Sequence, residues 1–247
     1  MNLELLRSYN IFKDELLNLE LLKNQGFNNI SYLLKTSSKS YVIRVFKSNE
    51  SVNISRKFEY EIQKKAYKKN IASKPIFLNE NFMIYEYEKG LHKTELSTLE
   101  LKNLVLKIKK FHKFKIDQKP YNLKKDLLNY DKSLDDFRSK KLIKESFRNL
   151  FLLKRYKQDL VLTHHDLNPK NIIFRNNSIK IIDWEYAGLN DRFFDLASIC
   201  VEFSLNKKDE KLILRNYFNH YKKDHLQKLN HFKIVYKNLC TLWFRCY

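Results

Sequence analysis

The sequence has little cysteine, proline or glycine, with three residues of each in 247. The cysteines, Cys200, Cys240 and Cys246, show no metal-ligand spacing, which argues against a disulfide scaffold and a zinc site and fits a reducing cytoplasm. The chain also lacks any run of the roughly 20 apolar residues that a membrane-spanning helix needs. Acidic residues interrupt the apolar pattern at the N-terminus, which is not typical of a signal peptide. We therefore expect a cytoplasmic protein with no membrane span.

Basic residues outnumber acidic ones: 48 Lys and Arg face 28 Asp and Glu, for a formal net charge of +20. Such an excess is typical of proteins that bind nucleic acid or an anionic membrane. Here the lysines are spread along the helical stretches, and no segment matches a known nucleic-acid-binding module. We interpret the charge as a compositional bias and predict no nucleic-acid partner. Hydrophobic residues make up 43% of the chain, which excludes intrinsic disorder.

Residues 1–89 predict a small lobe that contains both helices and strands. In chain order, the patterns indicate a helix over 2–22, a hairpin with strands over 30–35 and 41–46, a helix over 54–69 and a strand over 82–87. Residues 90–247 predict a larger, mainly helical lobe. Its patterns indicate a helix over 97–113, one or two helices within 123–157, strands over 172–174 and 179–182, and helices from 193 onward. The predicted fold class is therefore α+β with two lobes.

The segment from His164 to Asn171 carries the clearest chemistry. Pro169 prevents a helix from running through it, so Asp166 and Asn171 lie in a loop just before a strand. Asp183 follows the next strand. Asp and Asn in a loop often serve only turn formation, but this spacing and context match the template for phosphoryl transfer. Asp166 would accept the proton of the attacking hydroxyl, and Asn171 and Asp183 would supply oxygen ligands to Mg²⁺.

Residues 161–203 contain a set of spaced polar and aromatic residues: Asp166, Asn171, Asp183, Trp184, Glu185, Tyr186, Asn190, Asp195 and Glu202. With this set the segment resembles the choline/ethanolamine kinase family, within the aminoglycoside-phosphotransferase and protein-kinase-like superfamily. It is most similar to bacterial choline kinases of the surface-phosphocholine pathway. The resemblance implies a two-lobed protein-kinase-like fold that uses ATP and Mg²⁺. Residues 1–89 would form a nucleotide-binding lobe, and residues 90–247 a catalytic and acceptor-binding lobe.

The resemblance also places a phosphate-covering turn at residues 26–29, between the first two strands. Only one glycine is present there, so Asn28 and Asn29 would supply side-chain amides or left-handed turn residues. An ordinary hairpin turn is the alternative interpretation. Arg44 lies where many kinases have a lysine, and its guanidinium would hold the α- and β-phosphates.

The partner of Arg44 is expected on the following helix, where Glu59 is the first candidate and Glu61 the competing one. The resemblance further assigns Glu86 and Tyr87 to the hinge, where backbone groups would contact adenine. All these nucleotide contacts are expectations from the resemblance.

A quaternary ammonium ligand has no N–H to donate, so its recognition needs aromatic faces and carboxylates. The acceptor-binding residues implied by the resemblance are Glu185, Tyr186, Asp195, Glu202 and Trp243. The family often has two tryptophans one helical turn apart, and Cys240 takes the place of the first. For Asp195 a helix-capping role and support of the catalytic loop both remain open. His164 and His165 are expected to orient the loop, since no further ligands lie at metal spacing.

The predicted function is therefore the ATP- and Mg²⁺-dependent phosphorylation of choline. Ethanolamine or another small amino alcohol is the nearest alternative, and an aminoglycoside is a further one. A basic nucleic-acid- or membrane-binding protein is the alternative outside enzymes, and it depends on the net charge alone. A pseudokinase is disfavoured because Asp166, Asn171 and Asp183 are all present.

Overall fold

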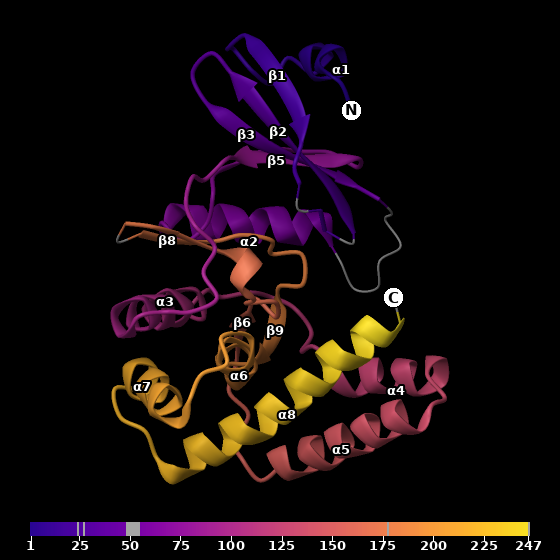
Figure 1. The fold of residues 1–247 in the computed structure, drawn as a ribbon, viewed down its shortest axis with the longest axis vertical. Coiled ribbons are helices and arrows are strands. Elements are labelled where there is room, and N and C mark those ends of the chain that lie inside the picture. The colour runs from indigo at the N-terminus through magenta and orange to yellow at the C-terminus, as the bar shows by residue number, and fades with distance from the viewer. Residues whose placement is uncertain (24, 27, 48–54, 177, 247) are drawn as a thin grey trace. The chain divides into compact units, whose positions relative to one another are not determined.

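The structure is a computed structural model that describes residues 1–23, 25–26, 28–47, 55–176 and 178–246 (Figure 1). The chain folds into two compact units, which are described separately below. The first unit comprises Met1–Leu91 and Ile173–Tyr186, and the second comprises His92–Ile172 and Ala187–Tyr247. The first contains an antiparallel sheet and the second is mainly helical, so the predicted α+β class is confirmed.

A five-stranded antiparallel sheet in the order β1-β2-β3-β5-β4 forms the centre of the first unit. Its strands are β1 (Leu16–Leu21), β2 (Asn29–Thr36), β3 (Ser40–Phe46), β4 (Pro75–Leu78) and β5 (Phe82–Glu86). Arg44 lies on the middle strand, opposite Ser31 of β2 and Met83 of β5. Leu34, Ile43 and Phe82 contribute to a buried core on this sheet. Arg44 is thus anchored in the middle strand of the sheet, between β2 and β5.

The predicted helix over 2–22 is wrong over most of its length. Helix α1 covers only Leu3–Ser8, and residues 16–21 form β1, which pairs Leu19 with Leu34 and Leu21 with Tyr32. A leucine-rich segment satisfies both the helical and the strand pattern. Pairing with β2 decides between the two, because tertiary contacts override weak local propensity.

Helix α2 (Arg56–Lys68) begins at Ser55, whose side chain accepts the backbone amide hydrogen of Phe58. This is the capping contact expected at the start of a helix. The buried face of α2 carries Ile62 and Ala66 and also the carboxylate of Glu59. The predicted helix over 54–69 is confirmed over residues 56–68, and residue 54 lies outside the described residues. The helix brings one acidic side chain into the interior.

The hairpin of β7 (Ile172–Arg175) and β8 (Ser178–Ile181) belongs mostly to the first unit. The Ile181 amide donates to the Ile71 carbonyl at 2.7 Å, and Phe174 exchanges two backbone hydrogen bonds with Leu91. The predicted lobes of residues 1–89 and 90–247 therefore differ from the compact units in this segment. Backbone hydrogen bonds to residues 71 and 91 hold it in the first unit.

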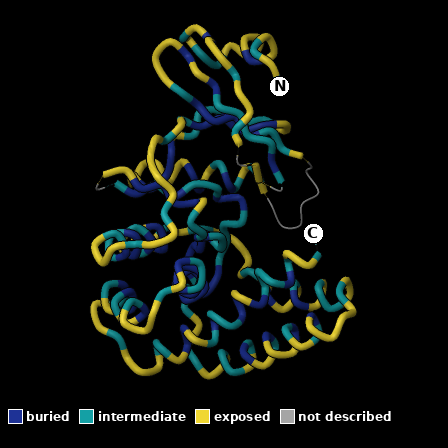
Figure 2. Tube along the Cα trace, in the orientation of Figure 1, coloured by how far each residue is buried: buried dark blue, intermediate teal, exposed yellow. Residues whose placement is uncertain are grey.

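The second unit consists of helices around a short β ladder. Its elements are α3 (Thr98–Phe111), α4 (Leu123–Ser133), α5 (Phe137–Leu153), β6 (Leu160–Thr163), the 3₁₀ turn Pro169–Asn171, β9 (Gly188–Asp191), α6 (Phe193–Glu202), α7 (Lys207–Phe218) and α8 (Lys223–Cys246). β6 pairs antiparallel with β9. Helix α6 is buried along most of its length, as its dark blue trace shows (Figure 2). Helix α8 packs against α5 and α6.

None of the helices in the described ranges combines the length and the apolar character that a bilayer crossing requires.

Candidate active site

The loop after β6 is held in the second unit by the buried carboxylate of Asp195. The backbone amides of His164 and His165 donate to Asp195 at 2.8 and 3.0 Å. His165 has φ 69°, a left-handed conformation that is uncommon outside glycine. Asp195 is the third residue of α6 and not its cap. Of the two roles left open for Asp195, the structure therefore shows support of the loop.

Asp195 is itself supported by a buried histidine. His112 Nε2 lies 3.0 Å from Asp195 Oδ2, and His112 Nδ1 lies 2.6 Å from the Tyr217 hydroxyl. Burial lowers the pKa of His112, because removal from water disfavours the charged ring. Burial would raise the pKa of Asp195, but the hydrogen bonds from His112 and the His164 amide, together with the electrostatic effect of His112 and His165, outweigh it, so the pKa lies below its usual value. The result is a buried chain of hydrogen bonds that ends on the loop backbone.

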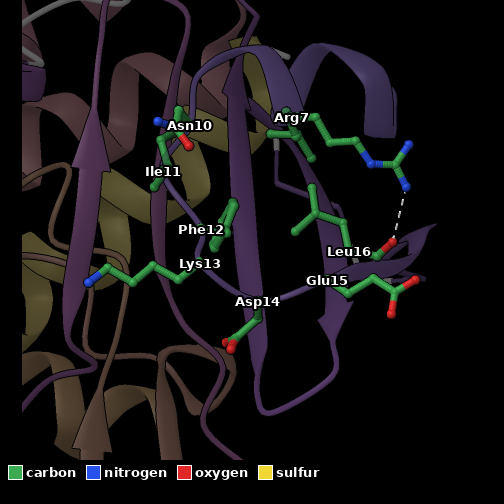
Figure 3. Close-up of a pocket in the computed structure, with 9 residues that line it drawn as sticks. Arg7, Asn10, Ile11, Phe12, Lys13, Asp14, Glu15 and Leu16 are labelled. Carbon is green, nitrogen blue, oxygen red and sulfur yellow. Dashed lines mark hydrogen bonds between the residues drawn. The ribbon is translucent and has the colours of Figure 1, made fainter.

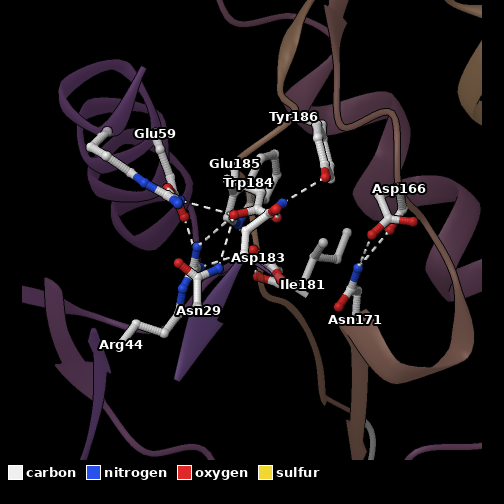
Figure 4. Close-up of polar contacts among 12 residues, drawn as sticks. Asn29, Arg44, Glu59, Asp166, Asn171, Ile181, Asp183, Trp184, Glu185 and Tyr186 are labelled. Carbon is white, nitrogen blue, oxygen red and sulfur yellow. Dashed lines mark hydrogen bonds and ion pairs between the residues drawn. The ribbon is translucent and has the colours of Figure 1, made fainter. Parts of the chain in front are cut away.

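Two side-chain amides fix the carboxylate of Asp166, as Figure 4 shows for Asn171. Asn171 Nδ2 donates to Asp166 Oδ2 at 2.7 Å and to the Asp166 carbonyl at 2.9 Å. Asn168 Nδ2 donates to Asp166 Oδ1 at 2.8 Å. Each carboxylate oxygen thus accepts one amide and keeps acceptor capacity for a further donor. Because Asn171 uses its nitrogen on Asp166, its oxygen Oδ1 is the atom suited to a cation.

Arg44 is the centre of a buried ion-pair cluster in the first unit (Figure 4). Its Nη1 lies 2.7 Å from Glu59 Oε1 and 2.9 Å from Asp183 Oδ1. Its Nη2 lies 3.2 Å from Glu185 Oε2. The predicted partner Glu59 is confirmed over Glu61, which is exposed. Arg44 and Glu59 are 3% and 0% exposed, so water cannot screen this pair.

A second guanidinium, which sequence reasoning missed, belongs to the same cluster. Arg56 Nη1 lies 3.1 Å from Glu59 Oε2 and 2.9 Å from Glu185 Oε2, and its guanidinium lies 4.2 Å from the Phe46 ring centroid. Arg56 stands three residues before Glu59 at the start of a helix, a spacing that brings two side chains together. That spacing was the available signal.

Asn28 and Asn29 contact the cluster through their side chains. Asn28 Nδ2 donates to Glu185 Oε1 at 3.0 Å and to the Tyr186 hydroxyl at 2.8 Å. Asn29 Nδ2 donates to Glu185 Oε2 at 2.9 Å. The side-chain amides of both asparagines are thus used within the protein, and their contact with phosphates stays a prediction. Phe27 of the same predicted turn lies outside the described residues.

The cluster fits a divalent cation by its charge. Within the described residues, its ion pairs join two guanidiniums to three carboxylates. Asp183, with φ 64° and a side chain 30% exposed, is the most accessible of those carboxylates. Carboxylate and amide oxygens are the ligands that Mg²⁺ prefers. In the described ranges, no group of three or more His, Cys, Asp or Glu side chains is arranged to hold a metal ion.

The predicted hinge residues are already hydrogen-bonded within the first unit. The amide of Glu86 donates to the Lys74 carbonyl and that of Tyr87 to the Ser40 carbonyl, both at 2.9 Å. The Glu86 side chain pairs with Lys39 at 2.9 Å. A contact between these residues and adenine stays a prediction.

The predicted acceptor residues fall into separate groups. Glu185 and Tyr186 contact Asn28 and Asn29 in the first unit, whereas Asp195 holds the loop. In the second unit, Glu202 Oε1 accepts the Tyr236 hydroxyl at 2.9 Å. Burial raises the pKa of Glu202, and the negative charge of Asp166 contributes.

Tyr236, Cys240 and Trp243 follow one another along α8 at spacings that place them on one face. Burial raises the pKa of Cys240 to about 12, so its thiol stays protonated. Trp243 is half-buried, and its ring centroid lies 5.1 Å from that of Phe244. This face of α8, together with Glu202, gives the second unit two aromatic rings, a thiol and a carboxyl group.

A hollow of about 400 Å³ lies elsewhere in the first unit, at the segment that joins α1 to β1 (Figure 3). Its lining includes Asn10, Phe12 and Asp14. Its lining contains none of the predicted site residues.

Comparison with known proteins gives concordant results. The family model described as "Choline/ethanolamine kinase" matches residues 15–236. Protein LicA of Haemophilus influenzae is 38% identical over 96 residues, which are 35% of this chain and only 27% of that protein. A LicA homolog of Mycoplasma capricolum subsp. capricolum is 26% identical over 223 residues, 90% of this chain and 87% of that protein.

Among solved structures, choline kinase LicA from Streptococcus pneumoniae superimposes with a TM-score of 0.81 at 20% identity, covering 98% of this chain and 89% of that one. The predicted protein-kinase-like fold is thereby confirmed.

Proposed function

The chain belongs to the choline/ethanolamine kinase family and is a small-molecule kinase, and from that premise we propose that it transfers the γ-phosphoryl group of ATP to the hydroxyl of choline. The observation that carries this proposal is the fixed carboxylate of Asp166, which two amides hold at 2.7 and 2.8 Å. A general base works only if its oxygen is held at the position of the proton that it removes. The products are phosphocholine and ADP.

In the proposed reaction, the choline oxygen forms a bond to the γ-phosphorus while the bond from that phosphorus to the bridging β–γ oxygen breaks. The hydroxyl proton passes to Asp166, and ADP leaves. Positioning and charge supply most of the catalysis in phosphoryl transfer. Asp195 contributes to positioning here, because it fixes the backbone just before Asp166.

Asn171 and Asp183 would hold Mg²⁺. When bound, the ion supplies positive charge that bridges the phosphates and stabilises the developing negative charge. Arg44 would bind the α- and β-phosphates with its planar fork, and Asn28 and Asn29 would cover them from the turn before β2.

The acceptor would bind on the second unit, against Glu202 and the α8 face of Tyr236 and Trp243. Aromatic rings and a carboxylate attract a quaternary ammonium. A cation beside Glu202 would favour its charged form and oppose the effect of burial on its pKa. The relationship to LicA supports choline. Ethanolamine is the second candidate, because Cys240 is small and the Glu202 oxygens can accept from a primary ammonium.

We place the reaction in the cytoplasm, where ATP is available and cysteines stay reduced. The test is an acceptor panel of choline, ethanolamine and an aminoglycoside, read as ADP released from MgATP. Choline is expected to give the highest kcat/KM. Asp166→Asn should abolish release, whereas Asp117→Asn, an exposed matched control, should not. A preference for ethanolamine would overturn the choline assignment, and no release with any acceptor would overturn the enzyme assignment.

A further inference from the structure

Glu185 accepts four side-chain hydrogen bonds, and all four donors belong to the first unit. Oε1 accepts Asn28 Nδ2 at 3.0 Å. Oε2 accepts Asn29 Nδ2 at 2.9 Å, Arg56 Nη1 at 2.9 Å and Arg44 Nη2 at 3.2 Å. The residue is 8% exposed. Three of the four donors share Oε2, so that oxygen is fully occupied by side chains of the first unit.

The partners of Glu185 come from three parts of the first unit. Asn28 and Asn29 lie at the start of β2, Arg44 on β3, and Arg56 at the start of α2. One carboxylate therefore ties the predicted phosphate-covering turn to two guanidiniums. Charge-assisted hydrogen bonds of this kind are stronger and more directional than neutral ones.

The contacts of Glu185 and Glu59 would keep Arg44 in place if Asp183 bound a cation. Arg44 now contacts Asp183 through Nη1, and also Glu59 and Glu185 through Nη1 and Nη2. If Asp183 turns to a cation, Glu59 and Glu185 still hold the guanidinium from two directions. Arg56 bridges those two carboxylates, and its positive charge offsets the repulsion between them.

We propose that Glu185 is a positioning residue of the nucleotide site, which fixes Arg44, Arg56 and the Asn28–Asn29 turn, and is not an acceptor ligand. This inference rests on the proposed function. It replaces the predicted role of Glu185 in substrate binding, and it assigns Arg56 to the same site as the residue that links Glu185 to Glu59.

The test compares Glu185→Gln with Glu61→Gln, an exposed glutamate on the same unit. Glutamine has nearly the same side-chain volume as glutamate but no charge. Its NH₂ group would also face side chains that donate hydrogen bonds to Glu185 in the wild type. Binding of a fluorescent ATP analogue with Mg²⁺ is measured without acceptor, and KM is measured for both substrates. We expect Glu185→Gln to weaken nucleotide binding roughly 10- to 100-fold, the range of one or two lost charge-assisted bonds. The acceptor KM should change less than about twofold, because Glu185 would not contact the acceptor.

A second variant keeps the test decisive if Glu185→Gln folds poorly. Asn29→Ala removes one of the four hydrogen bonds and no charge, and should weaken nucleotide binding about threefold to tenfold. Glu185→Asp should recover less than half of the lost binding energy, because its carboxylate cannot reach all four partners. A raised acceptor KM with unchanged nucleotide binding would overturn the proposal. A lower free energy of unfolding with unchanged nucleotide binding would also overturn it. If the wild type binds nucleotide but phosphorylates none of the acceptors, the proposed function fails, whereas the effect of Glu185→Gln on nucleotide binding can still be measured.

Discussion

The His112 ring lies 3.0 Å from the Asp195 carboxylate, and both side chains are buried beneath the loop that carries Asp166. The ring joins α3 to α6, residues far apart in the sequence. Its lowered pKa means that the folded protein resists protonation of this ring. The pair therefore links the stability of the loop support to pH.

The first prediction concerns this pH dependence. An unfolded histidine has a pKa of about 6.5, so below that pH the unfolded chain binds more protons than the folded one. The free energy of unfolding should therefore have its full value above about pH 7. Below that pH it should fall, by at most about 1.4 kcal/mol per pH unit for this one group. Urea unfolding at about pH 7.5 and 5.5 measures it.

His225 and His231 have lowered pKa values as well and act in the same direction. The variant His112→Gln separates their contribution, because it removes only the buried ring. Its stability should depend on pH less steeply than that of the wild type. An unchanged slope would show that His112 does not titrate on unfolding.

The second prediction concerns Asp195, whose two oxygens accept the amides of His164 and His165. In Asp195→Asn one oxygen becomes an NH₂ group that faces a backbone donor, so the loop has to shift. A displacement of about 1 Å of a catalytic group can cost on the order of 10²-fold, and we expect kcat to fall by about that factor. The KM of the nucleotide should stay near its wild-type value. A variant with wild-type kcat would contradict the assigned support role.

The third prediction distinguishes Glu59 from Glu61. Glu59→Gln leaves the buried Arg44 guanidinium with one fewer countercharge, and breaking a buried pair in this way costs about 3 kcal/mol. Glu61→Gln alters an exposed side chain and should change the free energy of unfolding by less than about 0.5 kcal/mol. Equal effects of the two substitutions would be incompatible with the ion pair.

The fourth prediction concerns Gly90. A Cβ atom at this position would overlap Ile173 Cγ2 and would lie 2.6 Å from the Phe174 carbonyl oxygen. The carbonyl belongs to the hairpin backbone and cannot yield like a side chain, so Gly90→Ala should destabilise the protein by about 1–3 kcal/mol. Gly26→Ala is the matched control, since no described atom lies within 4 Å of its added methyl group. Thermal unfolding of both variants decides the point.

The loop of the proposed catalytic residues could be predicted from the sequence because its parts are local. Asp166 and Asn171 lie five residues apart, and Asp183 follows the next hairpin. Such spacing is preserved in the fold and can be read directly. The same holds for Glu59, whose place on the buried face of α2 follows from helical periodicity.

Contacts between distant segments could not be predicted in this way. Asn28 meets Glu185 across 157 positions and His112 meets Asp195 across 83, and neither pair has a local signal. The helix expected at residues 16–21 is a strand for the same reason, since its pairing with β2 is a tertiary contact. Glu185 is a further example. The family motif marks this residue, but its hydrogen-bond partners are distant in the sequence and are known only from the structure.

The path of the chain has a consequence for dissecting the protein. The chain passes from one compact unit to the other at residues 91–92, 172–173 and 186–187, so no single cut separates them. A fragment of residues 1–91 would contain Arg44, Arg56 and Glu59 but neither Asp183 nor Glu185. In such a fragment the two guanidiniums would have only one carboxylate of the cluster as a partner. The remaining positive charge would be buried without a countercharge, which is strongly destabilising. Complementation with a separate peptide of residues 173–186 would be needed to restore the missing acids.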